Sequence, residues 1–137
     1  MNSKSFLIVF LFSAGLLLLS SCKKDDDMPG SGCNITGEGT IVTQTLALSN
    51  FSGIHLSLAG DVNLSQGATQ SVEVEGQVNI IEEIKTNVAN NFWVIGFEED
   101  CNYDYDELTI NITIPNLDKV EISGSGEIII NDFNNQN

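Results

Sequence analysis

The sequence has no arginine, one histidine, one tryptophan and two prolines, and its five lysines stand against 19 acidic residues. Its net charge is −14 at neutral pH, and the loss of Lys4 with residues 1–21 would change this to −15. Long-range repulsion makes nucleic acids and anionic lipid surfaces poor partners for such a chain. Cationic surfaces, divalent ions and neutral glycans remain as partner classes, and nucleic-acid binding is excluded.

Motifs for common enzyme chemistry are also missing. No nucleophile elbow surrounds a serine, and the single histidine, His55, alternates with Ile54 and Leu56, which places it on the strand face away from the core. The glycine turns at 37–39 and 124–126 have no lysine or helix start beside them for phosphate binding. Two cysteines and one histidine at these distances match no zinc-finger spacing. We therefore expect no catalytic residues and no cofactor.

The N-terminus carries the one long apolar run. This run, at 6–19, has about 14 residues, whereas a membrane-spanning helix, the alternative interpretation, needs roughly 20. Lys4 precedes the run and small residues follow it, so residues 1–21 are predicted to be a cleaved signal peptide. The ending Leu-Ser-Ser-Cys resembles a bacterial lipobox, which implies that Cys22 is acylated and anchors the protein to a membrane.

Residues 22–32 are polar, charged and rich in glycine, with one proline, and they cannot bury enough apolar surface to order themselves. We expect a flexible tether. Its lysines and aspartates directly after Cys22 are similar to the surface-export signal of lipoproteins from the Bacteroidetes. This resemblance implies an outer membrane lipoprotein exposed at the cell surface, and simple solvation of the charges is the alternative.

From Cys33 onward the chain has the length of one domain and mostly the period-two alternation of strands, clearest at 72–75 and 108–114. Only residues 79–88 show helix-like spacing. They are expected to form a helical turn or two, or else a buried strand with a charged edge. The region therefore reads as all-β.

One glycine-containing pattern occurs repeatedly. Residues 120–130 match residues 54–64 position by position, and a weaker copy lies at 35–41. If Ile35, Leu56 and Ile122 are equivalent, their separations are 21 and 66 residues, and 66 is three steps of 22. A period in the twenties is typical of stacked structural repeats, so the pattern predicts a solenoid with Gly/Ser turns over residues 33–137.

A family likeness rests on several short runs in order, at 37–54, 60–67, 72–75 and 122–127. Together they resemble the auto-transporter adhesin head GIN domain of Bacteroidetes lipoproteins. The resemblance implies a right-handed single-stranded β-helix with further Ser-Gly-Ser-Gly repeats. Because no capping element follows the last repeat, we expect the domain to be incomplete at its C-terminus. No catalytic residues are assigned in the family.

Cys33 and Cys101 are the thiols that remain once Cys22 is acylated. Disulfides persist outside the cytoplasm, so these two are expected to pair, with two unpaired buried thiols as the alternative. A bridge over so long a loop would add about 4 kcal/mol to stability in the chain-entropy model.

The stretch 98–107 holds six acids and two tyrosines. It is interpreted in three ways: as a solvated loop, as a calcium site, or as a contact patch for a sugar or a protein. Asp104 and Asp106 are the candidate calcium ligands, because oxygen ligands at alternate positions suit a hard cation. Tyr103 and Tyr105 are the candidate binding residues.

Three hypotheses about function follow. The first is a lipid-anchored envelope solenoid that presents a non-catalytic adhesion or binding surface to a glycan or protein ligand. The second is a structural envelope module without a ligand of its own. The third is a glycan-active enzyme, which would need two carboxyl groups at a defined separation. The lipobox, the repeat and the missing catalytic motifs favour the first.

Overall fold

The computed structural model describes residues 32–134, so the predicted signal peptide, Cys22 and nearly all of the tether lie outside the described residues. Within this range the elements follow one another as β1 (Asn34–Thr36), β2 (Ile41–Thr45), β3 (Gly53–Leu56), β4 (Asp61–Gln66), β5 (Ser71–Gln77), α1 (Val78–Ile81), β6 (Val88–Ala89), β7 (Phe92–Ile95), β8 (Asn102–Asp104), β9 (Thr109–Ile114), β10 (Lys119–Ile122) and β11 (Glu127–Asn131). None of the helices in residues 32–134 is long and apolar enough to cross a membrane.

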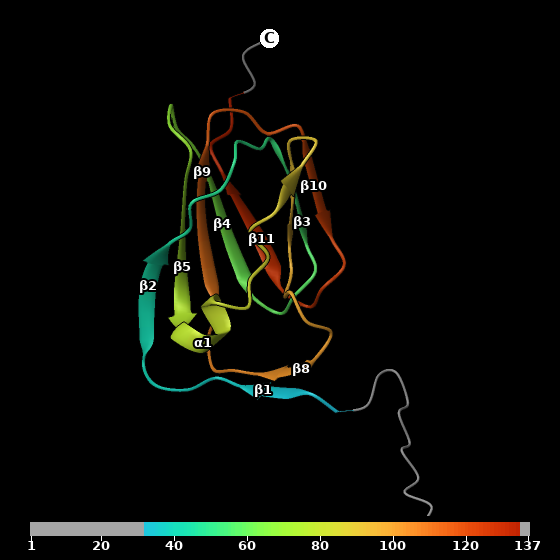
Figure 1. The fold of residues 1–137 in the computed structure, drawn as a ribbon. Helices are drawn as coiled ribbons and strands as arrows, with labels where there is room; N and C mark the ends of the chain where they lie inside the picture. The colour runs from blue at the N-terminus through green and yellow to red at the C-terminus, as the bar shows by residue number, and fades with distance from the viewer. Residues whose placement is uncertain (1–31, 135–137) are drawn as a thin grey trace, which may run out of the picture.

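The strands form two large sheets and one small one. The five-stranded sheet has the order β11-β4-β9-β5-β2, and the four-stranded sheet has the order β10-β3-β7-β6. A third sheet, β1-β8, crosses one end of the other two, below the short helix α1 (Figure 1). All-β architecture is therefore confirmed.

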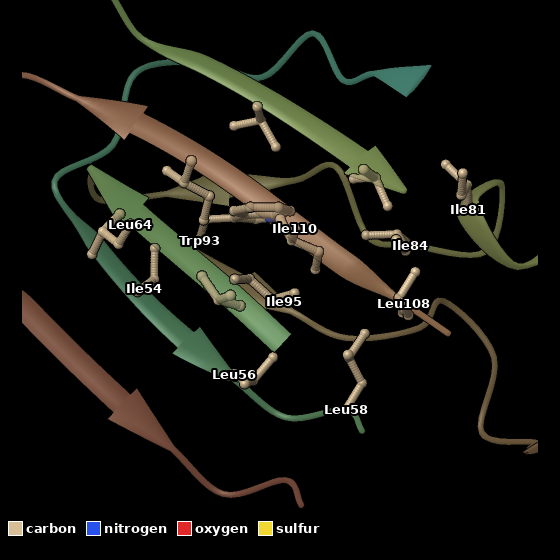
Figure 2. Close-up of a cluster of buried hydrophobic side chains, with 14 of the residues drawn as sticks. Ile54, Leu56, Leu58, Leu64, Ile81, Ile84, Trp93, Ile95, Leu108 and Ile110 are labelled. Atoms are coloured by element: carbon tan, nitrogen blue, oxygen red, sulfur yellow. The ribbon is translucent and has the colours of Figure 1, made fainter. Parts of the chain in front are cut away.

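The core lies between the two large sheets. On the four-stranded sheet, Ile54 and Trp93 are completely buried, and on the five-stranded sheet Leu64 and Ile110 are buried to the same extent. Figure 2 shows these side chains packed together in one cluster. Period-two alternation explains why each strand sends every second side chain into this layer.

The two strong copies of the repeat lie directly beside each other. β10 pairs in parallel with β3, with Ile122 opposite Leu56, and β11 pairs in parallel with β4, with Ile128 opposite Val62. The position-by-position match in the sequence is therefore a real structural register.

The prediction of a right-handed single-stranded β-helix is wrong. In such a helix each coil stacks on the preceding one, and all neighbouring strands are parallel. Here β5 pairs antiparallel with both β9 and β2, and β3 and β4 lie between β7 and β9 on one side and β10 and β11 on the other. Leu56 and Ile122, which are 66 residues apart in sequence, therefore lie on neighbouring strands and not on strands three repeats apart. The sequence could not show this, because a period of two does not specify which strands pair.

The expectation that Ile35, Leu56 and Ile122 occupy equivalent positions in one stack of repeats is also wrong. Ile35 lies opposite Tyr103 in the small sheet. Ile122 is paired with Leu56 as expected, but it is 51% exposed whereas Leu56 is fully buried. β10 is an edge strand, so no further strand covers the side chain of Ile122.

The predicted positions of individual strands and of the short helix agree with the structure. The strands expected at 72–75 and 108–114 correspond to β5 and β9, and β9 ends immediately before Pro115, which has no amide hydrogen to continue the ladder. The helix-like stretch 79–88 yields the single turn α1, which buries Ile80 and Ile81 against the core.

Candidate functional site

Residues 98–107, called the acid loop below, lie at the end of the molecule where the small sheet crosses (Figure 1). The strand β8 within this loop pairs in parallel with β1. The predicted disulfide is present: Cys33 is bonded to Cys101, with the two Cα atoms 4.9 Å apart and a sequence separation of 68. The acid loop is therefore held both covalently and by strand pairing.

The two candidate tyrosines meet at Phe97. The ring of Tyr103 stacks on the ring of Phe97 with centroids 3.8 Å apart, and Tyr105 meets the same ring edge-on at 5.7 Å. The Tyr103 hydroxyl donates to the carbonyl oxygen of Glu99 at 3.2 Å. The Tyr105 hydroxyl donates to the carbonyl oxygen of Ala59, in the turn between β3 and β4. Tyr105 therefore fastens the acid loop to the main body, and Tyr103 connects two parts of the loop itself.

Both tyrosines remain protonated at neutral pH. Burial raises the pKa of Tyr105, and the hydrogen bond to Ala59 opposes only part of this rise. Burial also raises the pKa of Tyr103, and the nearby carboxylate of Glu83 raises it further. Both side chains thus act as neutral hydrogen-bond donors.

A hollow of about 470 Å³, called the aromatic hollow below, opens between the acid loop and the turn after β3. This volume falls within the range of about 300 to 1,000 Å³ that is usual for ligand pockets. Its walls combine aromatic, polar and charged groups, namely Ser57, Leu58, Ala59, Lys85, Phe97, Glu98, Glu99, Asp100, Cys101, Tyr103 and Tyr105. The hollow thus brings together both candidate binding residues and half of the loop's acids.

Comparison with protein families assigns the chain. Residues 50–137 match the family described as "putative auto-transporter adhesin, head GIN domain". The chain belongs to this family. An adhesin-like family suggests a protein of the cell surface or envelope. A search of curated proteins finds no match to the chain.

Solved structures share the fold of this head GIN domain. A putative adhesin from Bacteroides fragilis is 20% identical with a TM-score of 0.65, and the match covers 72% of this chain and 46% of that one. A putative adhesin from Parabacteroides merdae is 20% identical with a TM-score of 0.64, and the match covers 72% and 41%. A putative lipid binding protein from Parabacteroides distasonis is 19% identical with a TM-score of 0.64, and the match covers 72% and 44%. The chain thus spans less than half the length of these structures.

The calcium interpretation gains no support from the geometry of this head GIN domain. Asp104 is exposed on β8, and Asp106 lies beside Gln77. Within residues 32–134, no group of three or more His, Cys, Asp or Glu side chains could hold a metal ion. A calcium site at Asp104 and Asp106 stays an untested prediction, and no step below depends on it.

Gln77 positions the end of the acid loop, and the sequence did not reveal this role. Its side chain is only 5% exposed, and its Oε1 accepts the backbone N–H of Asp106 at 3.3 Å. Its Nε2 donates to the carbonyl oxygen of Gly39 at 3.4 Å. Gln77 thus ties the end of β5 to two separate loops. A glutamine at the end of an alternating strand gives no sequence signal for such a role.

His55 faces outward from β3, as predicted, since its neighbours Ile54 and Leu56 are fully buried. Its Nε2 lies 2.7 Å from the hydroxyl oxygen of Ser123. The backbone N–H groups of Ser123 and Gly124 beside this pair both donate to the carbonyl oxygen of Leu56, so neither is free to stabilise an oxyanion.

Proposed function

We propose that this head GIN domain is the binding module of a lipid-anchored outer membrane protein, and that the aromatic hollow receives a sugar ligand at the cell surface. The observation that carries this proposal is the rigidity of the hollow. The acid loop that forms one wall is held by the disulfide and by strand pairing, and the Tyr105 hydroxyl connects it to the opposite wall. A preformed hollow loses little conformational entropy when it binds a ligand.

The composition of the hollow favours an uncharged ligand. The three acids Glu98, Glu99 and Asp100 outnumber the one lysine of the hollow, Lys85, and repel anions. The aromatic rings of the hollow offer apolar contact area for the C–H faces of a sugar. The hydroxyl of Ser57 already donates to the carbonyl of Ile95 at 3.0 Å, but a hydroxyl oxygen can still accept a bond from a sugar. A neutral glycan therefore fits better than an acidic one.

Filling the hollow tests this proposal. Ala59 is exposed on its rim and contributes to the tyrosine contact only through its backbone, so Ala59→Trp should block the hollow without unfolding the protein. Ala68→Trp is the matched control, because Ala68 is equally exposed but lines a different hollow of about 430 Å³. A panel of neutral glycans would be screened first, and any hit would be titrated by NMR.

We expect Ala59→Trp to weaken binding of such a glycan by at least about tenfold, equivalent to 1.4 kcal/mol, with Ala68→Trp unchanged. Equal affinity for both variants would overturn the assignment of the hollow. If no glycan binds, and pull-down from intact cells recovers only envelope proteins, the chain is a structural envelope module instead.

The anchor is tested separately. Cys22 is the predicted acylation site, so Cys22→Ala should release the protein from membranes and leave the precursor uncleaved at this position. Membrane fractionation and labelling with radioactive fatty acid measure the two effects. Entry of labelled fatty acid into the Cys22→Ala variant would contradict the lipobox assignment.

A further inference from the structure

The four-stranded sheet has one face in the core and one face outside. Trp93 and Ile95 of β7 are fully buried, so Phe92 and Val94, which alternate with them, point outward. His55 of β3 lies opposite Val94, and Glu121 of β10 lies opposite His55. The outward side chains of these strands, with Lys85 beside them, are called the outer face below.

A further hollow, of about 460 Å³, lies on the outer face between β7 and the segment before it. Its walls contain no acid and are made by Lys85, Asn87, Ala89, Asn90, Phe92 and Val94. Lys85 reaches this position because its backbone N–H donates to the carbonyl of Gly96 at 2.8 Å, which holds it alongside β7. This hollow differs from the aromatic hollow in having no negative wall.

Positive charge is concentrated on the outer face. The only lysines in residues 32–134 are Lys85 and Lys119, and both lie there with the single histidine of the chain. Glu121 is the only acid in the four strands, and its carboxylate is paired with Lys119 at 2.7 Å. Within residues 32–134, the ammonium of Lys85 has no ion-pair partner.

The outer side of the five-stranded sheet has the opposite character. Asp61 and Glu127 lie directly opposite each other there, and Glu73 and Glu75 project from β5. No lysine belongs to any of its five strands. The two sheets therefore turn electrostatically different faces to solvent, although the chain as a whole is strongly acidic.

The outer face also offers apolar area. Val94 is 37% exposed, and the ring of Phe92 lies 5.3 Å from the ammonium of Lys119. The side chains of Phe92 and Lys119 meet across Gly53, where an added Cβ would lie 2.5 Å from the Phe92 ring. The absence of a side chain at Gly53 thus keeps the face flat and leaves the ring accessible.

We propose that the outer face binds a short acidic oligosaccharide, whose carboxylates pair with lysines and whose ring faces pack on Phe92 and Val94. Lys85 and Lys119 lie at opposite edges of the sheet, with three strand spacings, about 14 Å, between them across the strands. Lys119 is level with Phe92, whereas the backbone N–H of Lys85 bonds to Gly96 four residues further along β7, which adds about 13 Å along the strand direction. A single small anion cannot reach both lysines, whereas a chain of linked sugars can. A long, densely charged polymer is disfavoured, since the net charge of −14 repels it beyond the local contacts.

The first test compares two probes with the same sugar backbone. Trigalacturonate and its methyl ester share the same rings and linkages, but only the first carries negative charge, because each carboxyl of the second is capped by a methyl group. NMR titration of the purified domain gives both affinities. We expect trigalacturonate to bind at least about tenfold more tightly than its methyl ester, because only trigalacturonate can form charged hydrogen bonds with the lysines. Equal affinities, or tighter binding of the ester, would overturn the proposal.

The second test separates local contact from overall charge. Lys85→Met should weaken trigalacturonate binding by at least about fivefold, while Thr43→Glu, which changes the net charge equally on the exposed side of β2, should leave it nearly unchanged. The double variant Lys119→Met/Glu121→Gln keeps the net charge and should also weaken binding. Equal losses in Lys85→Met and Thr43→Glu would reduce the effect to long-range repulsion and overturn the proposal.

Lys85 lines both the outer face and the aromatic hollow, so the variants that separate the two sites are made at residues that belong to only one of them. Ala59→Trp should leave trigalacturonate binding unchanged, and Lys119→Met/Glu121→Gln should leave neutral glycan binding unchanged. If Ala59→Trp abolished trigalacturonate binding, the acidic sugar would lie in the aromatic hollow, and the assignment to the outer face would be wrong.

Discussion

Gly126 lies directly against Gly60 in the neighbouring strand connection. A Cβ built on Gly126 would overlap the carbonyl oxygen of Gly60 and come within 2.9 Å of its carbonyl carbon. Among residues 32–134, only Gly32 and Gly39 are glycines with positive φ, so the requirement at position 126 comes from close backbone approach and not from backbone conformation. The contact lets β11 pair with β4 immediately after this turn.

Gly126→Val should therefore destabilise the protein. The added side chain must displace backbone, and overpacking of this kind costs about 1 to 3 kcal/mol. Chemical denaturation measures the change in the free energy of unfolding. Ser125→Ala, in the same turn but at an exposed position, is the control and should have little effect. Equal stability of Gly126→Val and the natural sequence would contradict the close contact.

Removing the disulfide should destabilise the protein by about 4 kcal/mol in the chain-entropy model, because the bond closes a loop with a sequence separation of 68 residues. The double variant Cys33→Ala/Cys101→Ala avoids the formation of mixed disulfides. Thermal unfolding of this variant, and of the natural chain with and without reductant, gives the loss. If the double variant unfolds at the natural temperature, the bond has no role in holding the acid loop.

Alkaline pH should weaken the fold through Tyr105. Burial raises its pKa above the ordinary 10.0, so at high pH the unfolded chain loses this proton before the folded protein does. The stabilisation is complete below pH 10 and falls as the pH rises from there through the pKa of the folded state.

The measurement is the free energy of unfolding from neutral pH to above about pH 10. Tyr105→Phe should reduce the alkaline slope, and Tyr103, whose pKa is also raised, should account for some of what remains. At neutral pH the same variant should lose about 1 kcal/mol, the usual contribution of one hydrogen bond. An unchanged alkaline slope would show that Tyr105 ionises normally in the folded protein.

The described part of the chain should self-associate at its β10–β11 edge. Ile122 is 51% exposed and Ile130 is 48% exposed, although their register partners Leu56 and Leu64 are fully buried. Both strands are also at sheet edges, which leaves backbone groups free to pair with another chain. Light scattering across a range of concentrations measures the association.

Ile130→Lys should reduce this association, because a charge on an edge strand opposes pairing. Val78→Lys is the matched control, since Val78 is 38% exposed but lies on α1, away from the edge. A monodisperse monomer of the natural sequence would contradict the prediction, and an equal effect of both variants would show that only the net charge matters.

The sequence by itself determined the local structure. Alternation at 72–75 and 108–114 identified β5 and β9, because a strand with one buried face must repeat every two residues. The match between 54–64 and 120–130 identified two segments in direct register. Cys33 and Cys101 were correctly predicted to form a disulfide, and the order of the glycine-rich runs identified the family.

The tertiary structure decided which strands are neighbours. A period of two is the same for parallel and antiparallel pairing, so nothing in β5 showed that it pairs antiparallel with both β9 and β2. For the same reason Ile35 could not be assigned to Tyr103. Gln77, and the grouping of Lys85 with Lys119 on one face, also arise from contacts between distant segments. Such contacts are set by backbone hydrogen bonds between distant segments, and the side-chain pattern of a single strand does not show which strand it pairs with.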